Sequence, residues 1–85
     1  MVMNSDAGTN FAVDQELDVK GLNCPLPILR TKLALSKMDS GQVLHVMATD
    51  PHSVVDFQAF CERTAHEMLR LERGDDLFEF YIRRE

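Results

Sequence analysis

The stretch LDVKGLNCPLPILRTK, residues 17–32, holds the end of a strand and the start of a helix, with a cysteine between them. Leu17 and Val19 alternate with charged residues, which is typical of a strand with one face in water. Proline is tolerated in the first helical turn, because an amide hydrogen there would have no partner within the helix. The stretch therefore predicts a strand, a short loop, and a helix that begins at Pro25 or Pro27.

The rest of the chain supplies three strands and a second helix. The first helix is expected to run to Met38, before an Asp-Ser-Gly stop. Residues 42–49 are apolar at nearly every position and predict a central strand. Asp50, as the N-cap, and the proline after it are expected to open a second helix that extends to about Ala65. Residues 67–85 alternate around Gly-Asp-Asp, which predicts a terminal hairpin.

The order of these elements is strand, helix, strand, helix, strand, strand. Alternating strands have one face in water, so both helices are expected on the other face. The predicted fold is an α/β two-layer sandwich of the α+β type, with a mixed four-stranded sheet and two helices on one face. Residues 1–14 show no periodicity and predict a flexible N-terminal tail, and residues 15–85 predict a single domain near the lower size limit for a self-sufficient core.

Periodicity also indicates which side chains enter the core. On the first helix the predicted core face consists of Pro27, Ile28, Thr31, Ala34, Leu35 and Met38. A second stripe on that helix, expected to be partly exposed, consists of Leu26, Leu29 and Leu33. The core face of the second helix is predicted to hold Val54, Phe57, Phe60, Cys61 and Ala65. In the hairpin, the residues expected to share a face are Leu69, Leu71, Phe78, Phe80 and Ile82.

The charge balance limits the classes of partner. Nine basic and fourteen acidic side chains give a net charge of −5, which repels nucleic acid and anionic membranes, so direct binding to either is not expected. No apolar run approaches the roughly 20 residues that span a bilayer. The first fifteen residues lack the charge and apolar block of a signal peptide, so a cytoplasmic location is predicted.

Cys24 is the candidate for chemistry, because it precedes the first helix. The positive end of the helix dipole and the free amides there favour a thiolate, which is the nucleophilic form. A cysteine at this place can equally be a small, buried helix cap, and the residues alone leave both interpretations open.

Few residues are available to assist Cys24. Its spacing from Cys61 fits neither a zinc site nor a Cys-x-x-Cys pair, and Cys61 is expected to be structural. No local motif pairs Cys24 with His45, His52 or His66, which disfavours a Cys-His hydrolase. No metal site and no cofactor are predicted, and the remaining chemistry is to accept a group, hold it and pass it on.

The quoted stretch, together with SGQVLHVMATDP, DFQAFCERTAHEM and a closing hairpin, resembles the TusA family of small sulfurtransferases, also called SirA-like. The resemblance runs from about Leu17 to Arg84 and includes the Cys-Pro-x-Pro signature at Cys24, Pro25 and Pro27. It implies a βαβαββ sandwich in which Cys24 is catalytic and carries sulfane sulfur as a persulfide.

The resemblance also implies partners. The donor of the persulfide would be a cysteine desulfurase or a rhodanese-like protein, and the sulfur would pass to an acceptor protein. Relatives serve tRNA 2-thiolation, molybdenum cofactor synthesis or sulfur oxidation. The predicted docking surface beside the cysteine consists of Leu26, Leu29, Arg30, Lys32 and Leu33. Two alternatives stay open: a non-catalytic interaction or regulatory module, and a thiol-disulfide protein that pairs Cys24 with Cys61.

Overall fold

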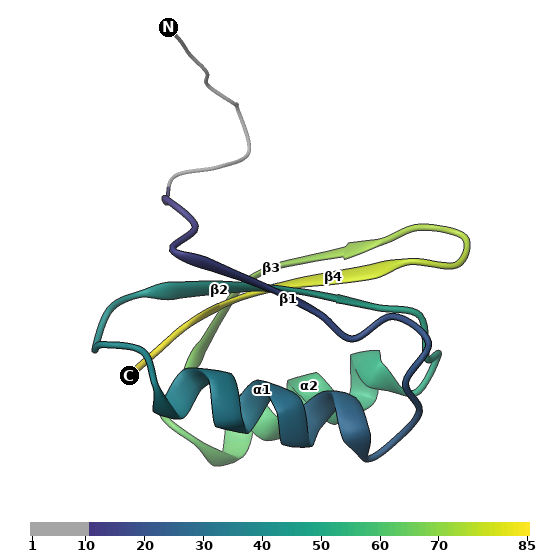
Figure 1. Cartoon of the computed structure of the whole chain (residues 1–85), viewed down its shortest axis with the longest axis horizontal. Helices are drawn as coiled ribbons and strands as arrows, with labels where there is room; N and C mark the ends of the chain where they lie inside the picture. The colour runs from purple at the N-terminus through teal and green to yellow at the C-terminus, as the bar shows by residue number, and fades with distance from the viewer. Residues whose placement is uncertain (1–10) are drawn as a thin grey trace, which may run out of the picture.

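Two helices and four strands make up residues 11–85, the part of the chain that the structure, a computed structural model, describes. In chain order they are β1 (Gln15–Asp18), α1 (Leu26–Ser36), β2 (Val43–Ala48), α2 (Ser53–Arg63), β3 (Glu67–Arg73) and β4 (Phe78–Arg83). Both helices cover the same face of the sheet (Figure 1). The predicted two-layer sandwich with βαβαββ order is confirmed.

The four strands form one mixed sheet in the order β1-β2-β4-β3. Strand β1 pairs with β2 in parallel, whereas β2 with β4 and β3 with β4 are antiparallel. β2 has a partner on each side, as expected for the predicted central strand, and every residue of β2 is buried or half-buried. The parallel pair places the carboxyl ends of β1 and β2 at the same edge of the sheet.

The core lies between the sheet and the helices. Phe57 of α2 and Phe80 of β4 are fully buried, and their rings stack with centroids 4.2 Å apart. Leu35 of α1 and Ile82 of β4 are buried with them, each stabilising the fold by about 1.5–3 kcal/mol relative to an exposed side chain. These contacts join both helices to the sheet.

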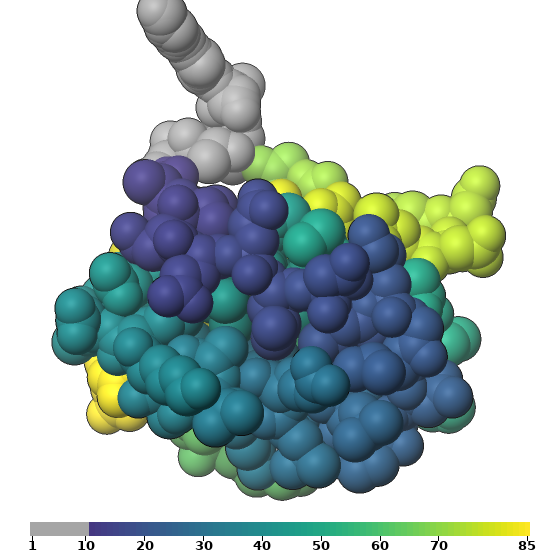
Figure 2. Space-filling view, in the orientation of Figure 1, coloured from purple at the N-terminus to yellow at the C-terminus, as the bar shows by residue number. Residues whose placement is uncertain are grey.

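The two stripes of α1 behave as predicted. Pro27, Thr31 and Leu35 are buried, and Ile28 and Ala34 pack at the edge of the core. Leu26, Leu29 and Leu33 are 45%, 51% and 55% exposed, which makes them three of the largest apolar side chains on the surface described by the structure. In the space-filling view α1 spreads over the lower front of the molecule with nothing covering it (Figure 2).

Helix α2 is shorter than predicted at both ends. Its N-cap is His52 and not Asp50, because Asp50 first makes a turn in which its carbonyl accepts the Ser53 N–H at 2.9 Å. At the other end the Thr64 hydroxyl donates to the Phe60 carbonyl at 2.9 Å and the backbone becomes extended. Ala65 therefore lies outside the helix and is exposed, so its predicted place on the core face is wrong.

The predicted orientation of Leu69 is also wrong. The pairing of β3 with β4 shifts by one residue between Met68, which is opposite Ile82, and Arg70, which is opposite Tyr81. A bulge of this kind leaves one residue without a partner and moves the residues before it to the other face. Met68 and Leu71 consequently pack against the core, and Leu69 does not join them.

The predicted tail, residues 1–14, lies outside the described residues except for its last four. Within those four, the Asp14 amide donates to the Val43 carbonyl at 2.9 Å and the Asp14 carboxylate accepts the Val43 N–H at 2.8 Å. The Phe11 ring lies 5.7 Å from that of Tyr81. Neither helix between residues 11 and 85 is long and apolar enough to cross a membrane.

Candidate functional site

Cys24 lies in the loop between β1 and α1, one residue before the N-cap of the helix. Helix α1 begins at Leu26, between the two predicted starts, with Pro25 as its N-cap and Pro27 in its first turn. The loop turns away from β1 at Gly21, whose φ of +83° favours glycine. The Cys24 residue is exposed and its thiol is free of any disulfide.

Two hydrogen bonds tie this loop to the segment that follows β2. The Gly21 N–H donates to the Thr49 hydroxyl at 2.9 Å, and the Cys24 N–H donates to the Asp50 carboxylate at 2.8 Å. Both bonds form because β1 and β2 are parallel, so the ends of the two strands lie side by side. The backbone of Cys24 is therefore held from two directions, by the start of α1 and by Asp50.

Asp50 is buried, with 6% of its side chain exposed. One carboxylate oxygen accepts the Cys24 N–H, and the other accepts the His52 N–H at 3.1 Å. The bond from the His52 N–H is the largest cause that holds the pKa of Asp50 below its usual value, followed by the bond from Cys24. The residue that the sequence presents as a helix cap is thus the side chain that positions the cysteine.

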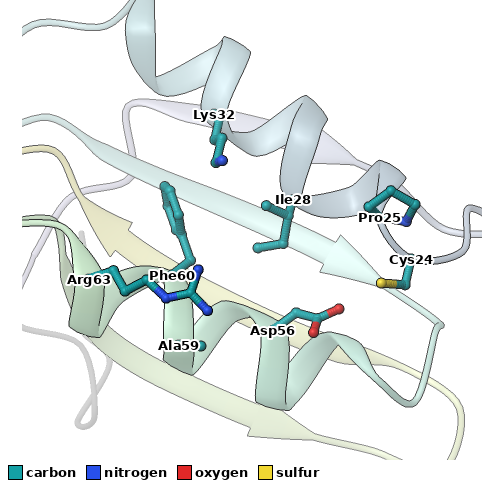
Figure 3. A pocket seen from close by; sticks show the side chains of 8 residues that line it. All are labelled: Cys24, Pro25, Ile28, Lys32, Asp56, Ala59, Phe60 and Arg63. Carbon is teal, nitrogen blue, oxygen red and sulfur yellow. The ribbon is translucent and has the colours of Figure 1, made fainter.

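A cleft of about 200 Å³ opens beside Cys24, between α1 and α2 (Figure 3). Its apolar lining consists of Pro25, Ile28, Ala59 and Phe60, and its charged lining consists of Lys32, Asp56 and Arg63. The Lys32 ammonium group lies 6.0 Å from the centroid of the Phe60 ring. The Cys24 residue is exposed at this cleft, and the lining of the cleft holds charged groups of both signs.

The thiol of Cys24 points toward Asp56, which belongs to the first turn of α2 (Figure 3). A hydrogen bond with the Asp56 carboxylate is the main cause that raises the pKa of the Cys24 thiol, with smaller effects from desolvation and from the charges of Asp56 and Asp50. The expectation that the helix dipole favours a thiolate is therefore wrong for the resting protein. The negative charges of Asp56 and Asp50 act on the thiol in the direction opposite to the partial positive charge at the start of α1.

The predicted docking residues differ in which hollow of the surface they line. Lys32 lines the cleft with Cys24, whereas Arg30 and Leu33 line a separate groove between α1 and β1. Leu26 and Leu29 are exposed on α1 but line neither of these two hollows. Lys32 lies toward the other end of the cleft from the sulfur, near the Phe60 ring (Figure 3), and the three leucines are exposed on α1.

Asp56 and Arg63 are site residues that the sequence reasoning did not identify. With Ala59 and Phe60 they recur at positions i, i+3, i+4 and i+7 of α2, which places all four on one side of the helix. That spacing is visible in the sequence. It could not be assigned to the cysteine without knowing that this side of α2 faces the start of α1.

The other candidate residues have structural surroundings. Cys61 is half-buried against the core, and burial raises the pKa of its thiol to about 11, which agrees with a packing role. His45 stacks on Tyr81 with ring centroids 4.4 Å apart, and His66 accepts the Glu85 N–H. Between residues 11 and 85 no group of three acidic, cysteine or histidine side chains is placed to hold a metal ion.

Comparison with known proteins places these features in a family. The profile of the family described as sulfurtransferase TusA matches residues 15–84. A sulfur carrier protein TusA from Allochromatium vinosum is 56% identical over 71 residues, which cover 84% of this chain and 93% of that protein. A sulfur carrier protein TusA from Pseudomonas putida is 36% identical over 76 residues, 89% of this chain and 95% of that protein.

A solved structure has the same fold. The crystal structure of a SirA-like protein from Desulfitobacterium hafniense superposes with a TM-score of 0.72 and 25% identity. The superposition covers 82% of this chain and 96% of the other.

Proposed function

We propose a sulfur-carrier function for this chain, because it belongs to the TusA family. In this proposal Cys24 accepts a sulfane sulfur atom, holds it as a persulfide and passes it to an acceptor protein. The proposal rests on the position of Cys24, which is an exposed free thiol beside a cleft. The backbone of Cys24 is held in place by the hydrogen bond from its N–H to Asp50.

The transfer consists of two exchange steps. The Cys24 sulfur attacks the outer sulfur of a donor persulfide, so a new S–S bond forms while the S–S bond of the donor breaks and leaves a donor thiol. An acceptor thiolate then attacks the outer sulfur on Cys24 and restores the Cys24 thiol. The number of S–S bonds is unchanged in each step, so neither step needs an oxidant or a reductant.

Proteins are the proposed partners on both sides. The donor would be a cysteine desulfurase or a rhodanese-like protein, and the acceptor would belong to tRNA 2-thiolation, molybdenum cofactor synthesis or another sulfur pathway. The net charge of −5 disfavours direct contact with the tRNA itself. We place the relay in the cytoplasm, where reducing conditions keep an exposed thiol such as Cys24 free.

Docking must supply the specificity, because the sulfur is exposed and the cleft is small. The predicted docking surface on α1 provides apolar area through Leu26, Leu29 and Leu33, which are about half exposed. Lys32 adds a positive charge to the lining of the cleft that opens beside Cys24. Exposed apolar residues that gather on one side of a helix are typical of a surface that a partner covers.

Loading with sulfur tests the proposal. We expect incubation with a cysteine desulfurase and cysteine to add the mass of one sulfur atom to the intact chain. Cys24→Ser should abolish the gain, and Cys61→Ser, the matched control, should retain it. An unchanged mass would favour a non-catalytic interaction module, and a reversible bond between Cys24 and Cys61 would favour a thiol-disulfide protein.

A further inference from the structure

Asp56 is the one carboxylate among the eight residues that line the cleft at Cys24. Its side chain and the Cys24 sulfur come from different elements and point toward each other (Figure 3). The Asp56 N–H donates to the His52 carbonyl at 3.1 Å, so the first turn of α2 fixes the backbone from which the carboxylate extends. Asp56 is half-buried, which leaves room for a reacting partner beside it.

Sulfur transfer requires that the proton of the Cys24 thiol be removed and later returned. The Cys24 sulfur must lose its proton when it attacks the donor and must regain a proton when the acceptor displaces it. Asp56, which faces the sulfur, and the nearby negative charges raise the pKa of the Cys24 thiol and so favour its protonated form. The Asp56 carboxylate faces the thiol and is placed to move this proton (Figure 3).

We infer that Asp56 carries the Cys24 proton during each transfer, an inference that rests on the sulfur-carrier function proposed above. In the loading step, Asp56 accepts the Cys24 proton as the Cys24 sulfur bonds to the outer donor sulfur. The donor S–S bond breaks, its electron pair stays on the donor sulfur, and Asp56 gives the proton to that sulfur. A thiol and a donor persulfide thus become a Cys24 persulfide and a donor thiol.

The discharge step uses Asp56 in the opposite order. Asp56 accepts the proton of the acceptor thiol as that sulfur attacks the outer sulfur on Cys24. The S–S bond on Cys24 breaks, and Asp56 returns the proton to the departing Cys24 sulfur. The carboxylate ends each step in the state in which it began.

The other charged groups around the sulfur are less suited to this role. Both oxygens of Asp50 already accept backbone hydrogen bonds, and its side chain is only 6% exposed. The His52 ring contacts the Asp50 carboxylate through its Nδ1 atom, and 82% of the His52 side chain is exposed. Lys32 and Arg63 also line the cleft, and their positive charges can attract a departing thiolate. Both side chains are already protonated, so neither can accept the proton of the thiol.

Asp56→Asn separates proton transfer from simple electrostatics. The amide has the size of the carboxylate but cannot accept the proton, and it removes a negative charge from beside the thiol. We expect Cys24 to react faster with iodoacetamide at neutral pH, because more of it is thiolate. Loading from glutathione persulfide should become roughly tenfold slower or more, because general acid–base assistance is lost.

Two further variants complete the experiment. Asp56→Glu keeps a carboxylate on the same turn and should recover part of the loading rate. Glu62→Gln removes an exposed carboxylate from the same helix outside the cleft and should leave both rates unchanged. A dependence of the loading rate on pH that differs between wild type and Asp56→Asn, with unchanged circular dichroism, would support the proton role over a structural one.

The results distinguish this inference from the proposed function. Faster loading together with faster alkylation in Asp56→Asn would overturn the proton role, since Asp56 would then only suppress the thiolate. Unchanged loading in that variant would overturn it as well. Failure of the wild-type chain to gain sulfur on Cys24 would overturn the sulfur-carrier function itself, and the proton role with it.

Discussion

The Asp50 carboxylate accepts hydrogen bonds from two backbone amides, and replacing Asp50 tests how much these bonds stabilise the loop that contains Cys24. Asp50→Ala removes the acceptor at 2.8 Å from the Cys24 nitrogen and the acceptor at 3.1 Å from the His52 nitrogen. Asp50→Asn leaves one carbonyl oxygen and therefore serves only one of these amides. The two variants form a graded series at a side chain that is 6% exposed.

The expected loss of stability follows from these two bonds. A hydrogen bond to a charged group contributes about 1.5–3 kcal/mol to stability, so Asp50→Ala should lower the free energy of unfolding by about 3 kcal/mol. Asp50→Asn should lower it by about half as much. For a chain of 85 residues the total is roughly 4–13 kcal/mol, so the loss in the alanine variant is a large fraction of it.

Urea denaturation followed by far-UV circular dichroism measures this loss, since the chain contains no Trp for fluorescence. The matched control is Asp18→Asn, because the Asp18 carboxylate also accepts a backbone N–H, from Lys20 at 2.9 Å, but is exposed. The control should change the free energy of unfolding by less than about 0.5 kcal/mol. A loss below about 1 kcal/mol in Asp50→Ala, or an equal loss in the control, would mean that the two hydrogen bonds to Asp50 do not stabilise the fold as described.

Three other predictions concern stability and thiol reactivity. The pKa of Asp50 is lower in the folded than in the unfolded chain, so the stabilisation by its carboxylate is complete above about pH 4 and is lost as the pH falls through the folded value. Urea midpoints measured at decreasing pH should show this loss of stability, and the Asp50→Asn variant should lack it. With a pKa of about 11, Cys61 should resist iodoacetamide at mildly alkaline pH while the exposed Cys24 reacts, so intact mass should show one label before unfolding and two after it. Phe57→Ala should lower the free energy of unfolding by about 3–5 kcal/mol, because the side chain is fully buried, and Leu29→Ala by less than about 0.5 kcal/mol; similar thermal melts for the two variants would contradict the assigned core.

The layered fold could be predicted because its determinants are local. Alternation in the strands at Leu17 and Val19 indicates one buried face, and the two stripes of α1 follow directly from helical periodicity. The bulge at Leu69 could not be predicted in this way, since it depends on how β3 pairs with β4. A shift of one residue reverses the faces without any change in composition.

The site was predictable in position but not in its electrostatics. The prolines around Cys24 indicate where the first helix begins, and α1 does begin there. The pKa of the Cys24 thiol depends on Asp50 and Asp56, which are far from Cys24 in sequence. The pairing of β1 with β2 and the packing of α2 against α1 bring these two carboxylates close to the cysteine. The helix dipole alone therefore predicts the wrong direction for the pKa of the thiol.

Cyanolysis of the loaded protein shows whether Cys24 carries a transferable sulfur, because cyanide removes only the outer sulfur of a persulfide and leaves the protein thiol. After incubation with a cysteine desulfurase and cysteine, and removal of both, we expect about one thiocyanate per chain from wild type and from Cys61→Ser, and none from Cys24→Ser. The free thiol of Cys24 should return as the thiocyanate appears. Thiocyanate from the Cys24→Ser chain, or none from wild type, would contradict the assignment of Cys24 as the residue that carries and releases sulfur.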